Sequence, residues 1–484
     1  MTAAAKSPIA LAALLFALHA GGAETAAVPP ERTSTLDDQQ SVAVTIYNEN
    51  LALVKDARSV VLDPGVNHLA LRDVSGRMRP ETALLRSLSA PGSFELLEQN
   101  FNFDLLTPAK LLEKYVGRQV KIVTTHPVSG AETVQAAQVL SAQEGVVLKI
   151  GDRIETGVPG RIVFDGVPTN LRDRPTLVTE LQNRKAGAQT LELSYLTGGL
   201  SWHADYVAEL GPGDTTLDLN GWVTLTNQSG TAYRNAKLQL VAGDVNQVRD
   251  VMNKAIGGVM AERMVAAAPA PMAQEALFEY HLYTLGRPTT LADHQTKQIA
   301  LLNAGGVPVT KELLLQGNES YYAGSVGEIG QKIKIGVFVE FANRESAHLG
   351  MPLPKGVVRV YKRDSAGNAQ FVGEDRIDHT PKNEKVRLHL GDAFDVTADK
   401  KQTDFRVRPQ PNKHDAYESA YEIVLRNAKA EPVTVTVREP VPGDWTMLQQ
   451  SLRHAKVAAG TAEWKVEVPA NGSTMLKYRV LVKY

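Results

Sequence analysis

The sequence contains no cysteine among its 484 residues, and this absence excludes several kinds of chemistry at once. Disulfide bonds, iron–sulfur clusters, thiolate zinc sites, cysteine nucleophiles and a lipidated cysteine all require the missing side chain. The chain also lacks an excess of either charge, because 52 Lys and Arg face 53 Asp and Glu for a net charge of −1. Nucleic-acid binding depends on a basic excess or a basic stripe, so we expect no nucleic-acid partner.

Long apolar segments are scarce as well, and the one that stands out lies near the start of the chain. Residues 9–18 form an apolar run that follows Lys6 and precedes the small residues 20–23, the order of parts in a secretory signal peptide. The run is shorter than the roughly 20 apolar residues that cross a bilayer. We therefore expect residues 1–23 to be a signal peptide, cleaved after Ala23 or Ala26, and the mature chain not to span a membrane. The absence of cysteine from an exported protein favours a bacterial periplasmic or secreted location.

The sequence does contain a repeated alternation of apolar and polar residues, and this pattern predicts a mainly β protein. Val42, Val44 and Ile46 set a period of two that recurs to the end of the chain, with Gly, Pro and Asp turn signals between the runs. Short alternating strands at such spacing are typical of immunoglobulin-like sandwiches. We expect a multi-domain antiparallel β-sandwich architecture with one or two short helices.

Composition divides the chain further. Residues 24–40 are rich in Ala, Pro, Thr and Asp without an apolar period, which predicts a flexible leader. Residues 244–276 collect Met, Ala, Gly and Pro, which predicts a mobile loop. The expected organisation is a signal peptide at 1–23, a leader at 24–40, an N-terminal β domain at 41–196, a central β domain at 197–400 containing the loop 244–276, and a C-terminal immunoglobulin-like sandwich at 401–484.

One helix is predicted with clear boundaries. Thr107 can cap its start, Pro108 occupies the first helical position, and Gly117 stops it. Leu111, Leu112 and Tyr115 form its apolar face.

Two glycine pairs, at 198–199 and 305–306, lack the framework of a phosphate-binding loop. Because both pairs lie between apparent strands, they predict turns.

Four stretches in the second half of the chain carry a family resemblance. They read YLTGGLSWHADYVAEL, GWVTLTNQSGTAYRNAKLQLVAGDV, PLPKGVVRVYKRDSAGNAQFVGEDRIDHTPKNEKVRLHLGDAFDV and REPVPGDW. In this order they resemble the uncharacterised C-terminal domain of mucoidy-inhibitor-like bacterial envelope proteins, over residues 195–484. The resemblance implies an exported or envelope-associated β protein, and the family's name suggests control of capsule or exopolysaccharide. The better-known members have a coiled coil before this domain, whereas no sustained heptads are found here.

Ser201, His203 and Asp205 are the residues most suggestive of catalysis, since they share one face of an expected strand. Same-face neighbours on a strand are about 6.6 Å apart, beyond hydrogen-bond reach unless the strand bulges. A G-x-S-x-G nucleophile elbow is also missing. We therefore expect Trp202, Ala204 and Tyr206 in the core and the polar trio in solvent.

A hard metal ion such as calcium or zinc would suit a second group of polar side chains. Their spacing matches neither an H-E-x-x-H pair nor an EF-hand loop, so a charged hairpin is the favoured interpretation. The pair Asp293 and His294 gives a still weaker metal signal. The group comprises Glu374, Asp375, Asp378, His379, His389 and Asp392.

Methionines concentrate in the predicted loop, and their thioethers suggest Cu(I) ligation or an apolar docking segment. Irregular spacing favours a loop without a ligand. These methionines are Met252, Met260, Met264 and Met272.

Four tyrosines are candidates for stacking on sugar rings, although strand core is the simpler interpretation of most of them. They are Tyr321, Tyr322, Tyr361 and Tyr417.

These observations favour an exported envelope protein that acts by recognition or scaffolding and binds an envelope protein or a polysaccharide. The alternative is a hydrolase or metal-dependent enzyme with its site in the central domain, near 201–205 or 374–379. We assign no catalytic, cofactor-binding or metal-binding residue and no cofactor from the sequence, and the oligomeric state stays open.

Overall fold

The structure is a computed structural model that describes residues 30–168, 171–243, 245–246, 272–410 and 415–484. The predicted signal peptide at 1–23, residues 24–29 of the leader and most of the loop 244–276 lie outside the described residues. Strands dominate the described part, which forms four sheets and contains one α-helix. The prediction of a mainly β, sandwich-like fold is therefore confirmed. Within the same part, no helix has the length and apolar character needed to cross a membrane.

The N-terminal unit is a sandwich of a four-stranded sheet on a larger sheet whose main path has seven strands. The order of the first is β1-β4-β12-β6, and that of the second is β17-β18-β16-β2-β3-β13-β5, with β19 beside β16. Apolar side chains such as Ile46, Leu69 and Leu177 fill the space between the sheets as one core. The strands are β1 (Arg32–Ser34), β2 (Gln39–Tyr47), β3 (Leu51–Leu62), β4 (Gly65–Arg72), β5 (Leu84–Ser87), β6 (Phe94–Asn102), β12 (Thr176–Asn183), β13 (Gly187–Thr197), β16 (Tyr233–Ala242), β17 (Ala273–Leu277), β18 (Tyr280–Thr284) and β19 (Thr289–Leu291).

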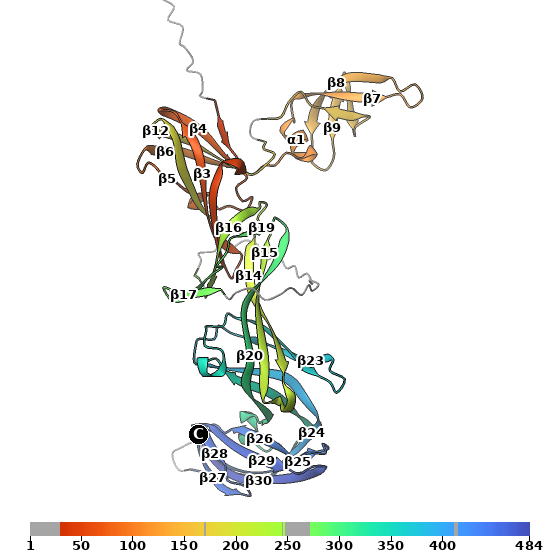
Figure 1. Ribbon diagram of the computed structural model, residues 1–484. Helices are drawn as coiled ribbons and strands as arrows, with labels where there is room; N and C mark the ends of the chain where they lie inside the picture. Colours follow the sequence, from red (N-terminus) through yellow and green to blue (C-terminus); the bar gives the residue numbers. More distant parts are fainter. Residues whose placement is uncertain (1–29, 169–170, 244, 247–271, 411–414) are drawn as a thin grey trace, which may run out of the picture.

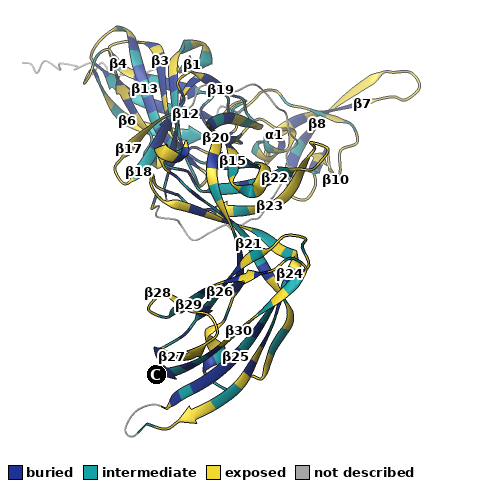
Figure 2. Ribbon diagram, turned by 60° about the horizontal axis from the view of Figure 1, so that its bottom comes forward, coloured by how far each residue is buried: buried dark blue, intermediate teal, exposed yellow. Residues whose placement is uncertain are grey.

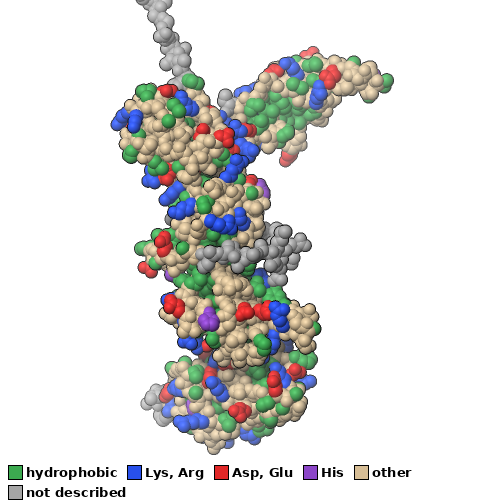
Figure 3. Space-filling model, viewed as in Figure 1, with side chains coloured by type: hydrophobic (Ala, Val, Ile, Leu, Met, Phe, Trp, Pro, Cys, Tyr) green, Lys and Arg blue, Asp and Glu red, His purple; other side chains and the backbone are tan. Residues whose placement is uncertain are grey.

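A small unit is inserted between β6 and β12 and projects to the side of the molecule (Figure 1 and Figure 3). Its helix α1 (Pro108–Lys114) begins as predicted, because the Thr107 side chain accepts a hydrogen bond from the Lys110 backbone and Pro108 opens the first turn. The unit has its own core around Ile122 and Leu148. Its strands, in the sheet order β10-β9-β8-β7-β11, are β7 (Gln119–Thr125), β8 (Glu132–Ser141), β9 (Val147–Ile150), β10 (Arg153–Thr156) and β11 (Arg161–Val163).

The central and C-terminal parts share one sheet of thirteen strands. Two long strands, β20 (Gln295–Gln316) and β24 (Lys385–Arg408), run through both parts and connect them (Figure 1). In the central part the order is β23-β22-β14-β15-β20-β21-β24, and the sheet curls until β23 reaches β24, where an Asp375 carboxylate oxygen accepts the His389 N–H at 2.7 Å. The other central strands are β14 (Leu200–Leu210), β15 (Thr216–Asn227), β21 (Glu328–Ala342), β22 (Gly356–Arg363) and β23 (Ala369–Ile377).

The C-terminal unit is a second sandwich, which forms a separate lobe with a buried interior (Figure 2). Strands β24, β25 and β30 form one layer with β27, and β26 and β29 form the other layer with β28.

Five 3-10 turns occur along the described chain: η1 (Leu36–Asp38), η2 (Pro80–Thr82), η3 (Pro212–Asp214), η4 (Glu319–Tyr322) and η5 (Glu345–Ala347). The remaining strands all belong to the C-terminal sandwich. The strands are β25 (Ala416–Asn427), β26 (Val433–Pro440), β27 (Asp444–Gln450), β28 (Ala455–Ala458), β29 (Thr461–Val468) and β30 (Gly472–Lys483).

The boundaries of these units differ from the expected ones. Ordered structure begins within the expected leader, because β1 adds to β4 and the buried Arg58 guanidinium donates to the Ser34 carbonyl. The expected divisions at 196/197 and 400/401 fall inside β13 and β24, whose alternation continues through them. The C-terminal core also includes Leu313 and Ile335, well before residue 401.

The two glycine pairs have different outcomes. Gly199 adopts a φ of 81° in the turn between β13 and β14, as expected. In contrast, Gly305 and Gly306 lie inside β20 at an irregularity in its pairing with β15, where Asp218 accepts the Gly306 N–H at 2.8 Å. A bulge thus replaces the predicted turn.

Candidate functional site

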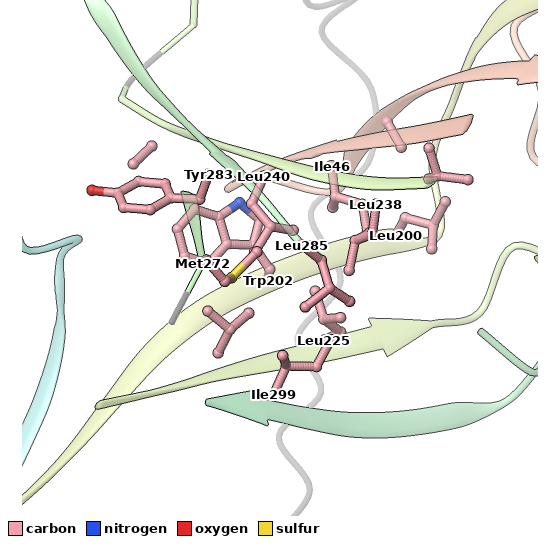
Figure 4. Close-up of a cluster of buried hydrophobic side chains, with 14 of the residues drawn as sticks. Ile46, Leu200, Trp202, Leu225, Leu238, Leu240, Met272, Tyr283, Leu285 and Ile299 are labelled. Carbon is pink, nitrogen blue, oxygen red and sulfur yellow. The ribbon is translucent and has the colours of Figure 1, made fainter. Parts of the chain in front are cut away.

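The strand that carries the suspected catalytic trio is β14, and its alternate residues face opposite environments. Trp202, Ala204 and Tyr206 are buried as expected, and Trp202 packs with Tyr283 and Met272 in the core (Figure 4). Ser201, His203 and Asp205 point to the outer face of the sheet. Strand β14 therefore fixes the trio on the outer face because its apolar side is held in the core.

Asp205 is less solvated than the sequence suggested, since only 15% of its side chain is exposed. One of its carboxylate oxygens receives His203 Nε2 at 3.1 Å and Thr224 Oγ1 at 2.6 Å. The other receives an Arg359 guanidinium nitrogen at 3.0 Å. The expectation that strand spacing keeps His203 and Asp205 apart is wrong, because their side chains incline toward each other and close the distance.

These contacts extend into a row of side chains across five strands. Gln298 on β20 donates to Thr224 Oγ1 at 3.2 Å, and Arg359 on β22 also contacts Glu374 on β23 at 3.3 Å. The strand pairing places Gln298 opposite Thr224, Thr224 opposite His203, and Arg359 opposite Glu374. We call this outer surface of β20, β15, β14, β22 and β23 the polar face.

The electrostatics of the polar face centre on Asp205. Partial burial alone raises the pKa of Asp205, but the hydrogen bonds from His203, Thr224 and Arg359 outweigh it and lower the pKa well below its ordinary value. Asp205 is therefore ionised at every physiological pH and acts as a fixed acceptor that orients its three donors.

The arrangement does not complete a serine nucleophile. Among the described residues no hydrogen bond joins Ser201 to His203, whose Nε2 is directed to Asp205 instead. A nucleophilic serine needs a base within hydrogen-bond reach. The trio therefore lacks the contact between serine and base that acyl transfer would use.

The residues of the suspected metal group do not converge on one point, and most of them have other partners. Asp375 accepts the His389 backbone N–H, and Asp392 lies 3.5 Å from the Lys334 ammonium. His379 contacts Asn48 and accepts the Lys355 N–H on its other ring nitrogen. Across the described ranges no three His, Asp or Glu side chains are placed to hold a metal ion.

The weaker pair Asp293 and His294 is joined at 2.9 Å. Asp293 also accepts the Gly230 N–H at 3.1 Å, which ties two loops together. This second contact gives Asp293 a structural role.

The methionine-rich segment lies almost wholly outside the described residues, and Met272 is the exception. Its thioether is buried beside Trp202 and Tyr283, so Met272 is part of the apolar core (Figure 4). Met252, Met260 and Met264 lie outside the described residues.

The four candidate tyrosines occupy different environments. Tyr322 is completely buried, which corrects the suggestion that it contacts sugars, and Tyr321 and Tyr417 are half-buried in the C-terminal unit. Tyr361 lies on the polar face, opposite Phe371, with the two ring centroids 5.7 Å apart. Phe371 is 56% exposed, so an aromatic edge is available to a ligand there.

Comparison with known protein families identifies the domain to which the polar face belongs. A family model described as Domain of unknown function (DUF4139) matches residues 191–484, more than half of the chain. The chain belongs to the DUF4139 family. Comparison of the sequence with curated proteins gives no match.

The DUF4139 region begins in β13 and ends with β30, so it contains both the polar face and the C-terminal sandwich. The match confirms that the second half of the chain is an uncharacterised domain, the coarser part of the resemblance found in the sequence. Within the DUF4139 region, sequence reasoning missed Arg359, Gln298 and Phe371 as parts of the site. Alternation in the run VVRVYKR is enough to predict that Arg359 faces outward. It does not predict that the neighbouring strand is β14, which carries Asp205.

Proposed function

We propose that this protein is an exported envelope protein that recognises a polysaccharide, and that the polar face is its contact surface. The observation that carries the proposal is the hydrogen-bonded row from Gln298 through Thr224 and Asp205 to Arg359 and Glu374. The role is recognition without a cofactor. The envelope location rests on the signal-peptide pattern at residues 1–23 and on the resemblance described above.

Preorganisation supports this role. Binding normally costs the conformational freedom of every side chain that it immobilises, and side chains already held by one another lose less. Arg359 is fixed by two carboxylates, and Arg363 is likewise held by Glu209 through contacts of 2.6 and 3.1 Å. A set of planar polar groups in fixed positions suits the regularly spaced hydroxyls of a glycan.

The shape of the face also suits a polymer. His203, Gln298 and Glu374 are exposed on an open sheet surface. Sugar rings present apolar C–H faces that pack on aromatic rings, and the Tyr361–Phe371 pair supplies such a surface beside the polar row. An open face can contact several consecutive sugars of an extended chain.

The test is binding of the full chain, without residues 1–23, to a panel of purified capsular polysaccharides and exopolysaccharides, followed by biolayer interferometry. We expect at least one polymer to bind and the double variant Arg359→Ala, Phe371→Ala to lose at least tenfold in affinity. Arg426→Ala is the control, because Arg426 also forms an arginine–aspartate ion pair, with Asp399, but on the C-terminal sandwich and away from the polar face. No binding to any polymer, or equal losses in both variants, would overturn the proposal.

A protein partner is the main competing occupant, and competition by enzyme-treated envelope extract distinguishes it from a glycan. Envelope extract treated with glycosidases should no longer compete for the polar face if the ligand is a polysaccharide. Competition that survives glycosidases and is abolished by protease would show that the ligand of the polar face is a protein. This result would overturn the glycan assignment.

A further inference from the structure

The core of the C-terminal sandwich contains an amine and a carboxyl group in direct contact. Lys400 on β24 and Glu439 on β26 belong to opposite layers, with Lys400 Nζ 2.6 Å from Glu439 Oε1. Lys400 is 3% exposed and Glu439 is 0% exposed. The pair therefore bridges the two layers at a place that solvent does not reach.

Aromatic side chains surround the pair. The Tyr322 hydroxyl donates to Glu439 Oε2 at 3.0 Å and lies 3.0 Å from the Tyr478 hydroxyl. Lys400 Nζ lies 4.5 Å from the centre of the Tyr321 ring and 5.4 Å from that of Tyr421. Among the described residues Lys400 and Glu439 form ion pairs only with each other.

This environment favours the uncharged form of Lys400. Burial lowers the pKa of Lys400, although the nearby Glu439 opposes the shift. Transfer of one proton from the ammonium to the carboxylate removes two charges from a dry interior. It leaves a neutral amine, which is a nucleophile, against a neutral carboxylic acid, which is an electrophile.

We propose that Lys400 and Glu439 join in an intramolecular amide bond that covalently links the two layers of the sandwich. The Lys400 nitrogen forms a bond to Glu439 Cδ, and the bond from Cδ to Oε1 breaks. The nitrogen gives up two of the three protons of its ammonium form, and these leave with Oε1 as water. One N–H remains on the amide, no net proton is released, and no oxidant or co-reactant is needed.

The surrounding groups suit this step. Tyr322 donates to Oε2, the oxygen on which negative charge develops when the nitrogen attacks, and preorganised donors at such a position stabilise the transition state. Holding the two groups in contact in a closed core makes the reaction effectively unimolecular. The Glu439 carboxyl also packs directly on Gly317, where a Cβ would lie 2.0 Å from Oε2.

The position of the link fits the fold. Immunoglobulin domains join their two layers by a disulfide packed against a buried tryptophan, and this chain has no cysteine. Here the buried Trp464 stacks on Tyr478, with ring centroids 4.8 Å apart, and the Tyr478 hydroxyl reaches the hydroxyl beside the Lys400–Glu439 pair. An amide at this position would provide the cross-link that the missing cysteines do not.

Intact mass spectrometry of the purified full chain tests the proposal directly. We expect a mass lower than the sequence mass by one water molecule, and a tryptic digest in which the chain is not cut after Lys400 and that peptide is joined to the one containing Glu439. A mass equal to the sequence mass, together with separate linear peptides, would overturn the proposal.

Three variants give independent readouts. Lys400→Met should show its full sequence mass. Glu439→Gln should form the same amide with loss of ammonia in place of water. Its final mass should therefore equal that of the cross-linked native protein. Tyr322→Phe should lower the cross-linked fraction at a fixed time after synthesis. If Lys400→Met does not fold, the Glu439→Gln mass still decides, because a variant that keeps its ammonia contradicts amide formation.

Discussion

The central sheet and the C-terminal sandwich both pair basic with acidic side chains, but the two pairs differ in exposure and in the number of their partners. On the polar face, Arg359 and Asp205 share their charges with several neighbours, and 36% and 15% of their side chains are exposed. In the sandwich core, Lys400 and Glu439 have no other acidic or basic partner among the described residues and almost no exposure. Because water can replace a lost partner only on the polar face, the loss of one partner should cost less stability there than in the sandwich core.

Removal of Glu439 should have the largest effect on stability. Glu439→Ala leaves Lys400 buried without its partner and also removes the proposed cross-link, and the loss of a buried partner costs about 3–5 kcal/mol. The measurement is urea unfolding followed by tryptophan fluorescence, to which Trp445 and Trp464 contribute from the C-terminal sandwich and Trp202 and Trp222 from the central sheet. The matched variant Glu374→Ala removes the exposed partner of Arg359 and should cost about 1 kcal/mol or less. Similar losses in both variants would contradict the distinction between the two regions.

Gly317→Ala probes the same core without removing a charge. The added methyl would lie 2.0 Å from Glu439 Oε2, and overpacking of this kind costs about 1–3 kcal/mol. Gly324→Ala is the control, because a Cβ at Gly324 has no neighbour within 4 Å and its φ is not positive. The check is the shift in midpoint of the same urea transition, and an unchanged Gly317→Ala midpoint would show that Glu439 moves freely.

Local signals in the sequence predicted the strands and helix α1 because each depends on neighbouring residues alone. Alternation placed Trp202 and Tyr206 in the core, and Thr107 with Pro108 marked the start of α1. The same alternation hid the unit boundaries, since β24 keeps its period through residue 400 while passing from one core to the next.

The two sites were harder to predict because they depend on pairing between distant segments. Arg359 reaches Asp205 only because β22 lies parallel to β14, more than a hundred residues away in sequence. Lys400 looked like an ordinary charged residue until β26 placed Glu439 opposite it. Tyr322 is buried for the same reason, since its hydroxyl has Glu439 as an acceptor.

Asp205→Asn should change the pH dependence of stability. The pKa of Asp205 is lowered in the folded state, so its contribution is present above an unfolded pKa of about 3.9 and is lost as pH falls toward the lower folded value. We expect the native protein to exceed the variant by about 1–2 kcal/mol at pH 7, and this difference to shrink below about pH 4. Unfolding curves at a series of pH values provide the measurement. A difference that stays constant down to pH 2 would show that Asp205 acts through packing alone.

His203→Ala should have the smallest effect on stability and the clearest separation between folding and recognition. His203 is exposed on the polar face and contributes one contact to Asp205, which keeps Thr224 and Arg359 as donors. Unfolding should therefore change by less than about 0.5 kcal/mol. His294→Ala is the matched control, because His294 is also exposed and paired with an aspartate but lies on a loop outside the polar face. If the polar face binds a glycan, His203→Ala weakens binding in the interferometry assay while His294→Ala does not. Equal binding by both variants would confine the contact surface to the Arg359 side of the row.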